Sequence, residues 1–151
     1  MFWRCIMGKK IEVLARGVCI VNGKMLLCHT KGDENTYLPG GHVEFKESAR
    51  EAICREISEE MDVSSNAGKY LGSVEHSFKQ KGKRHCEINI VFQVDIPEID
   101  SELDPESMED YIEFVWADIK ELAKHRLEPS ALIELIPQWL DNPADNWGSS
   151  Y

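Results

Sequence analysis

The chain has 151 residues, of which 42% are hydrophobic and 29% are charged, as is usual for one soluble globular domain. Its net charge of −10 argues against nucleic acid or an anionic membrane as a partner, because both bind a cationic protein face. No apolar run approaches the roughly 18 residues of a membrane-spanning helix, and the apolar start MFWRCIM is too short for a signal peptide.

We therefore expect a cytoplasmic protein with a single domain at residues 10–141. Residues 1–9 are predicted to be an N-terminal extension, since Met7 could be an alternative start, and residues 142–151 a loose polar tail. The five cysteines are scattered and form no CxxC pair, which indicates reduced thiols rather than disulfides or a metal–thiolate site.

The first predicted elements are two strands within residues 11–30, joined by a tight hairpin turn at Asn22-Gly23. A polar loop and the segment YLPGG then lead through a flexible turn to an amphipathic helix at residues 47–61. Three further strands and two further helices follow, at residues 69–78, 86–96 and 111–116 and at residues 118–124 and 129–140. Strands and helices that interleave without a regular βαβ rhythm indicate an α/β fold of the α+β type, with a mixed sheet covered by helices.

Glutamates crowd the last turns of the first predicted helix. At about 100° per residue, the apolar stripe around Ile53 also contains Glu60, and Glu56 lies beside that stripe. Glu51 falls on the solvent side, four residues before Arg55, as in an exposed ion pair. Carboxylates at the C-terminal end of a helix lie at the negative end of its dipole, so buried ones need compensation. Mg²⁺ or Mn²⁺, which prefer oxygen ligands, would compensate several at once. The alternative is a surface helix whose last turn is simply acidic.

The same residues resemble a known family motif. The chain contains Gly41, five residues, Glu47, seven residues and then REISEEMDV at residues 55–63. This pattern resembles the Nudix box of the MutT-like hydrolases. One position departs from the pattern, because Asp62 stands where the family has glycine. Aspartate is among the residues that adopt the left-handed conformation often required at a helix end, so we expect the motif to keep its shape.

The resemblance implies an α/β/α sandwich with a catalytic loop–helix–loop, and Mg²⁺-dependent hydrolysis of a pyrophosphate bond in a nucleoside diphosphate linked to another group. Mn²⁺ is the expected substitute for Mg²⁺. The metal ligands implied by the resemblance are Gly40, through its carbonyl oxygen, and Glu56, Glu59 and Glu60. The implied catalytic residues are Arg55, Glu59, Glu60 and Glu109, with Gly41 and Glu47 as structural residues of the motif. Glu113 and Glu44 are weaker alternatives near the expected site.

Two polar residues on the strand at residues 86–96 are candidates for substrate binding. Glu87 and Asn89 share the polar face of this strand, where a nucleotide or sugar could lie. The alternative is an ordinary strand that faces solvent. Within the family, ADP-ribose-cleaving members carry a proline shortly after the box, whereas no proline occurs here between Val63 and Pro97. Nucleoside triphosphates, oxidised ones included, and nucleotide sugars therefore stay open as the small-molecule partner.

Two other functions are compatible with the same fold. One is a non-catalytic nucleotide-binding or regulatory module. The complete set of motif glutamates argues against this module. The other is isomerisation of an isoprenoid diphosphate. That reaction would need a reactive cysteine, and none of the five cysteines stands at a position that suggests this role. A homodimer could form through the polar tail or through the basic turn at residues 79–84.

Overall fold

The computed structural model describes residues 9–142 and 145–151. The predicted N-terminal extension lies outside the described residues except for its last residue, and so does Cys5. The other four cysteines, Cys19, Cys28, Cys54 and Cys86, are free thiols, as expected. No helix in the described ranges is long and apolar enough to cross a membrane.

Two sheets form the centre of the molecule. The larger is a mixed five-stranded sheet in the order β4-β1-β6-β5-β8, in which β1 runs parallel to β6 and β5 runs parallel to β8. Its strands are β1 (Ile11–Val18), β4 (Gly40–His42), β5 (Asn66–Gln80), β6 (Lys83–Asp95) and β8 (Trp147–Ser150). The smaller is antiparallel, in the order β2-β3-β7, with strands β2 (Ile20–Val21), β3 (Lys24–Thr30) and β7 (Ile112–Asp118).

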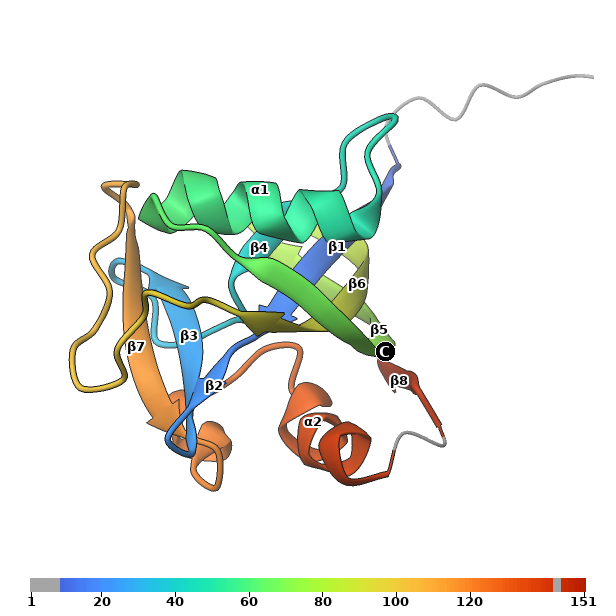
Figure 1. The fold of residues 1–151 in the computed structure, drawn as a ribbon. Helices are drawn as coiled ribbons and strands as arrows, with labels where there is room; N and C mark the ends of the chain where they lie inside the picture. Colours follow the sequence, from blue (N-terminus) through green and yellow to red (C-terminus); the bar gives the residue numbers. More distant parts are fainter. Residues whose placement is uncertain (1–8, 143–144) are drawn as a thin grey trace, which may run out of the picture.

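Helices cover both faces of the larger sheet (Figure 1). Helix α1 (Ala49–Met61) lies on one face, and α2 (Leu132–Asp141) lies on the other, next to β5. Each helix covers a separate cluster of buried apolar residues. Ile53 and Ile57 pack with residues of β1, β3, β6 and β7 under α1, and Ile136 and Trp139 pack in a second cluster under α2. The expected fold class, a mixed sheet between helical layers, is confirmed.

The predicted N-terminal hairpin is only half right. The Asn22-Gly23 turn exists, with φ of 52° and 78°, but it joins β3 to the two-residue strand β2. Strand β1 instead crosses to the larger sheet, where it pairs with β4 and β6. The sequence shows that β1 is extended, but the pairing depends on contacts far away in the chain, such as that between Gly17 and Pro39.

Three other expectations change in the structure. The YLPGG segment ends in the paired strand β4 rather than in a flexible turn. The helix expected at residues 118–124 is a short 3₁₀ helix at Leu122–His125. The C-terminal tail is not loose where it is described, because β8 runs along β5. The Asn146 carbonyl accepts from the Ser73 amide at 2.7 Å, and the Trp139 side chain donates to the Asp145 carbonyl at 2.9 Å, so a backbone and a side-chain hydrogen bond fix this segment.

Candidate active site

Helix α1 begins and ends at residues that satisfy its free backbone groups. Ser48 is the N-cap, and its hydroxyl and the Glu51 carboxylate each accept from the other residue's amide, which forms a capping box. The helix ends at Asp62 in the left-handed conformation, with φ of 54°, so aspartate does serve where the motif usually has glycine. The ion pair expected between Glu51 and Arg55 is wrong, because Glu51 is engaged in the cap and Arg55 points the other way.

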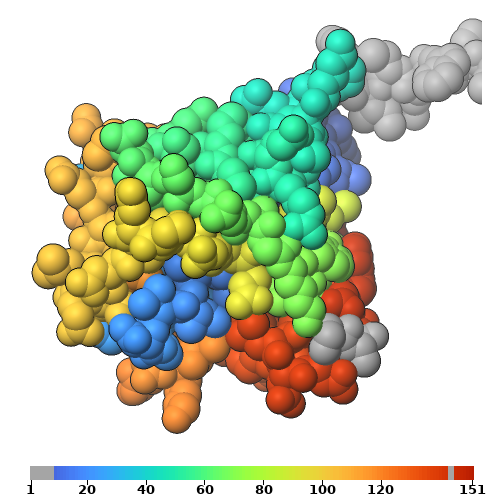
Figure 2. Space-filling model, viewed as in Figure 1, coloured from blue at the N-terminus to red at the C-terminus, as the bar shows by residue number. Residues whose placement is uncertain are grey.

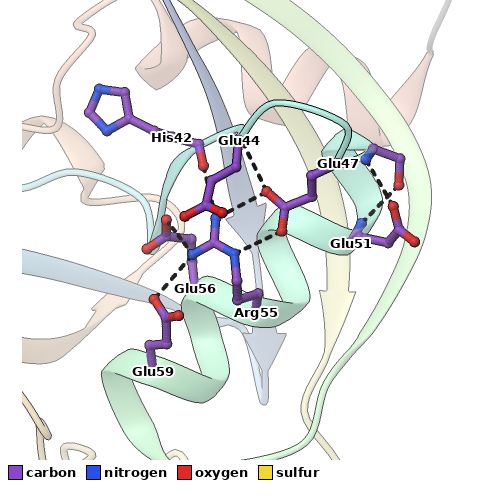
Figure 3. A network of polar contacts seen from close by, with 8 residues as sticks. His42, Glu44, Glu47, Glu51, Arg55, Glu56 and Glu59 are labelled. Atoms are coloured by element: carbon purple, nitrogen blue, oxygen red, sulfur yellow. Dashed lines mark hydrogen bonds and ion pairs between the residues drawn. The ribbon is translucent and has the colours of Figure 1, made fainter.

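Arg55 lies at the centre of a polar network that ties the approach loop to the helix (Figure 3). Its Nε donates to Glu47 Oε1 at 2.7 Å, and its Nη1 donates to Glu56 Oε1 at 3.0 Å and to Glu59 Oε2 at 3.1 Å. Its Nη2 donates to the His42 carbonyl at 3.0 Å. The hydrogen bond to Glu47 is the main reason that the pKa of Arg55 is raised further. One cation thus holds three carboxylates and one loop carbonyl in fixed positions.

Glu60 is the buried acid of the site, with 4% of the residue exposed. Burial raises the pKa of its carboxyl to about 8; Arg16 lowers it, and the nearby Glu56 and Glu109 raise it. Its Oε2 is buried and has no hydrogen-bond partner among the described residues. A buried acceptor without a partner is unfavourable, so this oxygen is available to a ligand that carries positive charge.

The two glycines before the loop are required by close packing. Gly40 has a φ of 127°, and a Cβ there would lie 2.1 Å from the Ala15 carbonyl oxygen. A Cβ on Gly41 would lie 2.5 Å from the carboxylate carbon of Glu56. Because no side chain fits at either position, β4 passes directly beside the carboxylates of α1. This contact brings the Gly40 backbone next to Glu60, whose pKa it lowers by a hydrogen bond.

The predicted acids do not all lie at the same place. Glu59 is 56% exposed at its side chain and faces Arg55. Glu109 is half-buried and near enough to Glu60 to raise its pKa, and its loop is attached to the helix end by a 2.8 Å hydrogen bond from the Met108 amide to the Glu60 carbonyl. Figure 2 shows the yellow segment after β6 lying against the green end of α1. Glu113 is exposed on β7 and pairs with His29.

The donor set fits a hard divalent cation. No three His, Cys, Asp or Glu side chains in the described part of the chain converge as ligands around one point. Nevertheless, Glu56 and Glu60 lie beside the Gly40 backbone, all donors are oxygen atoms, and Glu60 Oε2 is unpaired. The residues that could hold the ion are therefore Gly40, Glu56 and Glu60, with Glu59 at the edge of the group.

A pocket of about 920 Å³ lies on the face of the larger sheet that is turned away from α1. The predicted substrate residues Glu87 and Asn89 both line it, and Asn89 is fully buried. Asn89 accepts from Arg16 Nε at 3.3 Å and donates to Glu87 at 3.4 Å, so this strand face is not an ordinary solvent face. Tyr37 and Phe78 add aromatic surface to the pocket wall.

Sequence reasoning missed Arg16. This residue lines the pocket, and its Nη1 also donates to the Gly40 carbonyl at 2.9 Å, so it joins the pocket to the carboxylates. The available signal was a charged residue within the apolar run VLARGV, since an arginine inside a buried strand usually has a partner.

Comparison with known proteins identifies the group to which the chain is similar. The family model of the NUDIX domain matches residues 12–138. A Bacillus subtilis protein named "Putative 8-oxo-dGTP diphosphatase YtkD" is 34% identical over 88 residues, which cover 58% of this chain and 52% of that protein. The chain therefore spans about half the length of this relative.

Solved structures show the same fold. A MutT protein from Methanosarcina mazei Go1 superposes with a TM-score of 0.69 at 21% identity, covering 92% of this chain and 99% of the other. The Escherichia coli ORF135 protein superposes with a TM-score of 0.63 at 23% identity, covering 91% and 96%.

Proposed function

Because the chain belongs to the NUDIX domain family, we propose that this hydrolase cleaves a pyrophosphate bond in a nucleoside diphosphate linked to another group, with Mg²⁺ as cofactor. The observation that carries the proposal is the buried carboxylate of Glu60, which has an unpaired oxygen beside Glu56 and the Gly40 backbone. A surface helix that is merely acidic would leave such a group in water, where it needs no counter-charge.

The reaction adds one water molecule across a phosphorus–oxygen–phosphorus bridge. The water oxygen forms a bond to one phosphorus, and the bond from that phosphorus to the bridging oxygen breaks. The bridging oxygen leaves with the other phosphorus, and a proton of the water is released. A bound Mg²⁺ or Mn²⁺ neutralises charge on the phosphoryl oxygens and makes water more acidic. The Gly40 carbonyl oxygen and the carboxylates of Glu56, Glu59 and Glu60 would hold the ion.

The residues of the chain supply position and proton transfer. Arg55 donates one hydrogen bond to Glu56 and one to Glu59, which restrains the orientation of both carboxylates. Glu109 lies next to Glu60 on a separate loop and is our candidate for the base that accepts the proton of the attacking water. Glu59, at the exposed edge of the group, is placed to orient that water.

The pocket beside Arg16 is our candidate site for the nucleoside. Glu87 and Asn89 offer hydrogen-bonding groups on one wall, and Tyr37 and Phe78 offer ring faces for stacking. The name of the Bacillus subtilis relative makes nucleoside triphosphates, including oxidised ones, the first substrates to test, with nucleotide sugars next.

The test is a product-release screen over nucleoside triphosphates and nucleotide sugars, with Mg²⁺ present or chelated. We expect hydrolysis that stops on chelation, and a loss of about 100-fold or more in Glu60→Gln with the fold retained. Glu51→Gln is the matched control, because it changes a glutamate of the same helix that serves only the cap. Nucleotide binding by calorimetry without hydrolysis of any substrate would instead favour the non-catalytic module.

A further inference from the structure

Arg16 lies between the proposed metal ligands and the pocket proposed for the nucleoside. It projects from β1, in the middle of the larger sheet, and lines the pocket. Its Nη1 donates to two backbone carbonyls, those of Gly40 at 2.9 Å and Leu38 at 3.1 Å, and its Nε donates to Asn89 at 3.3 Å. The guanidinium carbon lies 5.4 Å from the centre of the Tyr37 ring. The Nη2 group donates to no described residue, so it is free to bind a ligand in the pocket.

The guanidinium of Arg16 occupies the environment that a divalent cation would also use. The Gly40 carbonyl is one of the proposed metal ligands, and Arg16 already donates to that oxygen. Glu60, another of the proposed metal ligands, lies beside the same Gly40 backbone. A cation held by the same oxygen and the same carboxylate would lie next to the guanidinium, and like charges at close range in a partly buried site repel strongly.

We propose that Arg16 couples metal binding to nucleotide binding: its guanidinium holds the Gly40 carbonyl until a metal binds, and the incoming cation displaces the guanidinium toward the phosphate of a nucleotide in the pocket. This inference rests on the proposed function. An arginine can bind a phosphate through two parallel hydrogen bonds, and Arg16 already lines the pocket in which the nucleotide would lie. Arg16 is thus a residue that binds substrate and positions the Gly40 carbonyl.

The consequence is positive cooperativity between the two ligands. Without nucleotide, the cation must displace Arg16 toward pocket carboxylates such as Glu87, which already accepts a hydrogen bond from Asn89, so the ion binds weakly. With nucleotide present, the displaced guanidinium finds a phosphate, so the ion binds more tightly. By linkage, the cation must tighten nucleotide binding by the same factor. Coupling of this kind typically changes affinity by about 5- to 150-fold.

The test measures Mn²⁺ affinity by electron paramagnetic resonance, without nucleotide and with the α,β-imido analogue of the best substrate from the screen. We expect the analogue to tighten Mn²⁺ binding by about tenfold in the wild type. Arg16→Met should bind Mn²⁺ alone several-fold more tightly than the wild type, should lose most of the coupling and should raise KM more than it lowers kcat. Arg50→Met removes the same charge at an exposed position of α1. It should leave the Mn²⁺ affinity, the coupling and the kinetic constants unchanged.

Arg16→Lys keeps the proposal testable if Arg16→Met does not fold. Lysine preserves the positive charge but cannot hold Gly40 and Asn89 together, so Mn²⁺ binding alone should stay near that of the wild type while the coupling falls. An Arg16→Met protein that binds Mn²⁺ no more tightly than the wild type would overturn the inference, and so would an Arg16→Lys protein with full coupling. If the wild type hydrolysed no substrate in the presence of Mg²⁺, that result would instead refute the proposed function itself.

Discussion

Glu60 makes the metal-free protein sensitive to pH. Its carboxyl has a pKa of about 8 in the folded chain and about 4.5 when unfolded, so between these values the folded state holds a proton that the unfolded state releases. The free energy of unfolding must therefore fall as the pH rises through this window, by on the order of a few kcal/mol in total. Because the group is destabilised only when charged, protein in EDTA should be most stable near pH 5 and less stable at pH 8.

Glu60→Gln tests the origin of this pH dependence. The neutral amide cannot ionise, so in EDTA the variant should have a higher Tm than the wild type at pH 8 and a flatter profile between pH 5 and pH 8. Thermal unfolding followed by circular dichroism measures both quantities. Equal slopes for the two proteins would show that another group is responsible. Added Mg²⁺ should stabilise the wild type more than the variant, because a ligand that binds only the folded state raises its stability.

Gly41 controls the position of Glu56. A methyl group at Gly41 would lie 2.5 Å from the carboxylate carbon of Glu56, so Gly41→Ala must push this carboxylate out of its present position. A displacement of about 1 Å at a catalytic centre can reduce the rate by about 100-fold. We expect kcat to fall by tenfold to 100-fold with little change in Tm, measured on the best substrate. Gly68→Ala is the control, since its Cβ would approach only one backbone oxygen, at 3.2 Å, far from the carboxylates.

At the scale of single elements, α1 owes part of its stability to its first turn. Ser48 and Glu51 satisfy two backbone amides that would otherwise lack partners. Ser48→Ala should lower the free energy of unfolding by about 1 kcal/mol, because one of these amides loses its acceptor. Urea denaturation measures the loss. Ser58→Ala, at an exposed position of the same helix, should change the stability by less than about 0.5 kcal/mol. A similar effect of both substitutions would argue against the cap.

Local patterns predicted this helix and the turns well. The periodicity of α1 placed Glu60 with the apolar residues, and the structure buries it. The Asn22-Gly23 pair predicted a tight turn because its two residues readily adopt positive φ. By contrast, the pairing of β1, the strand β8 and the contacts of Arg16 depend on residues more than twenty positions away. Such contacts leave no short-range pattern that identifies the partner, so the pairing of these strands could not be predicted, and the run VLARGV indicated only that Arg16 has a partner.

At the scale of the whole molecule, the proposed metal ligands all belong to the layer under α1, whereas the pocket lies on the side of α2. The layer under α1 sets the positions of the carboxylates, since the Ile53 side chain packs against Gly40, and a Cβ on that glycine would lie 2.8 Å from Ile53 Cδ1. The layer under α2 anchors β8 through Trp139 and carries none of the proposed metal ligands. Defects in either layer should lower the stability, but only a defect under α1 should disturb the geometry of the carboxylates.

Ile53 and Ile136 allow a matched test of this division, because both are isoleucines with no exposed surface, one in each core. Replacing either by valine removes one methylene group and should lower the free energy of unfolding by about 0.5–1.5 kcal/mol, measured by urea denaturation. Ile53→Val should also reduce kcat several-fold, because the gap lets the Gly40 backbone shift relative to α1. Ile136→Val should keep the wild-type kcat, since the folded protein retains the same carboxylate geometry. Equal losses of kcat in the two variants would show that the sheet transmits packing changes across both layers, and that the site depends on the whole core.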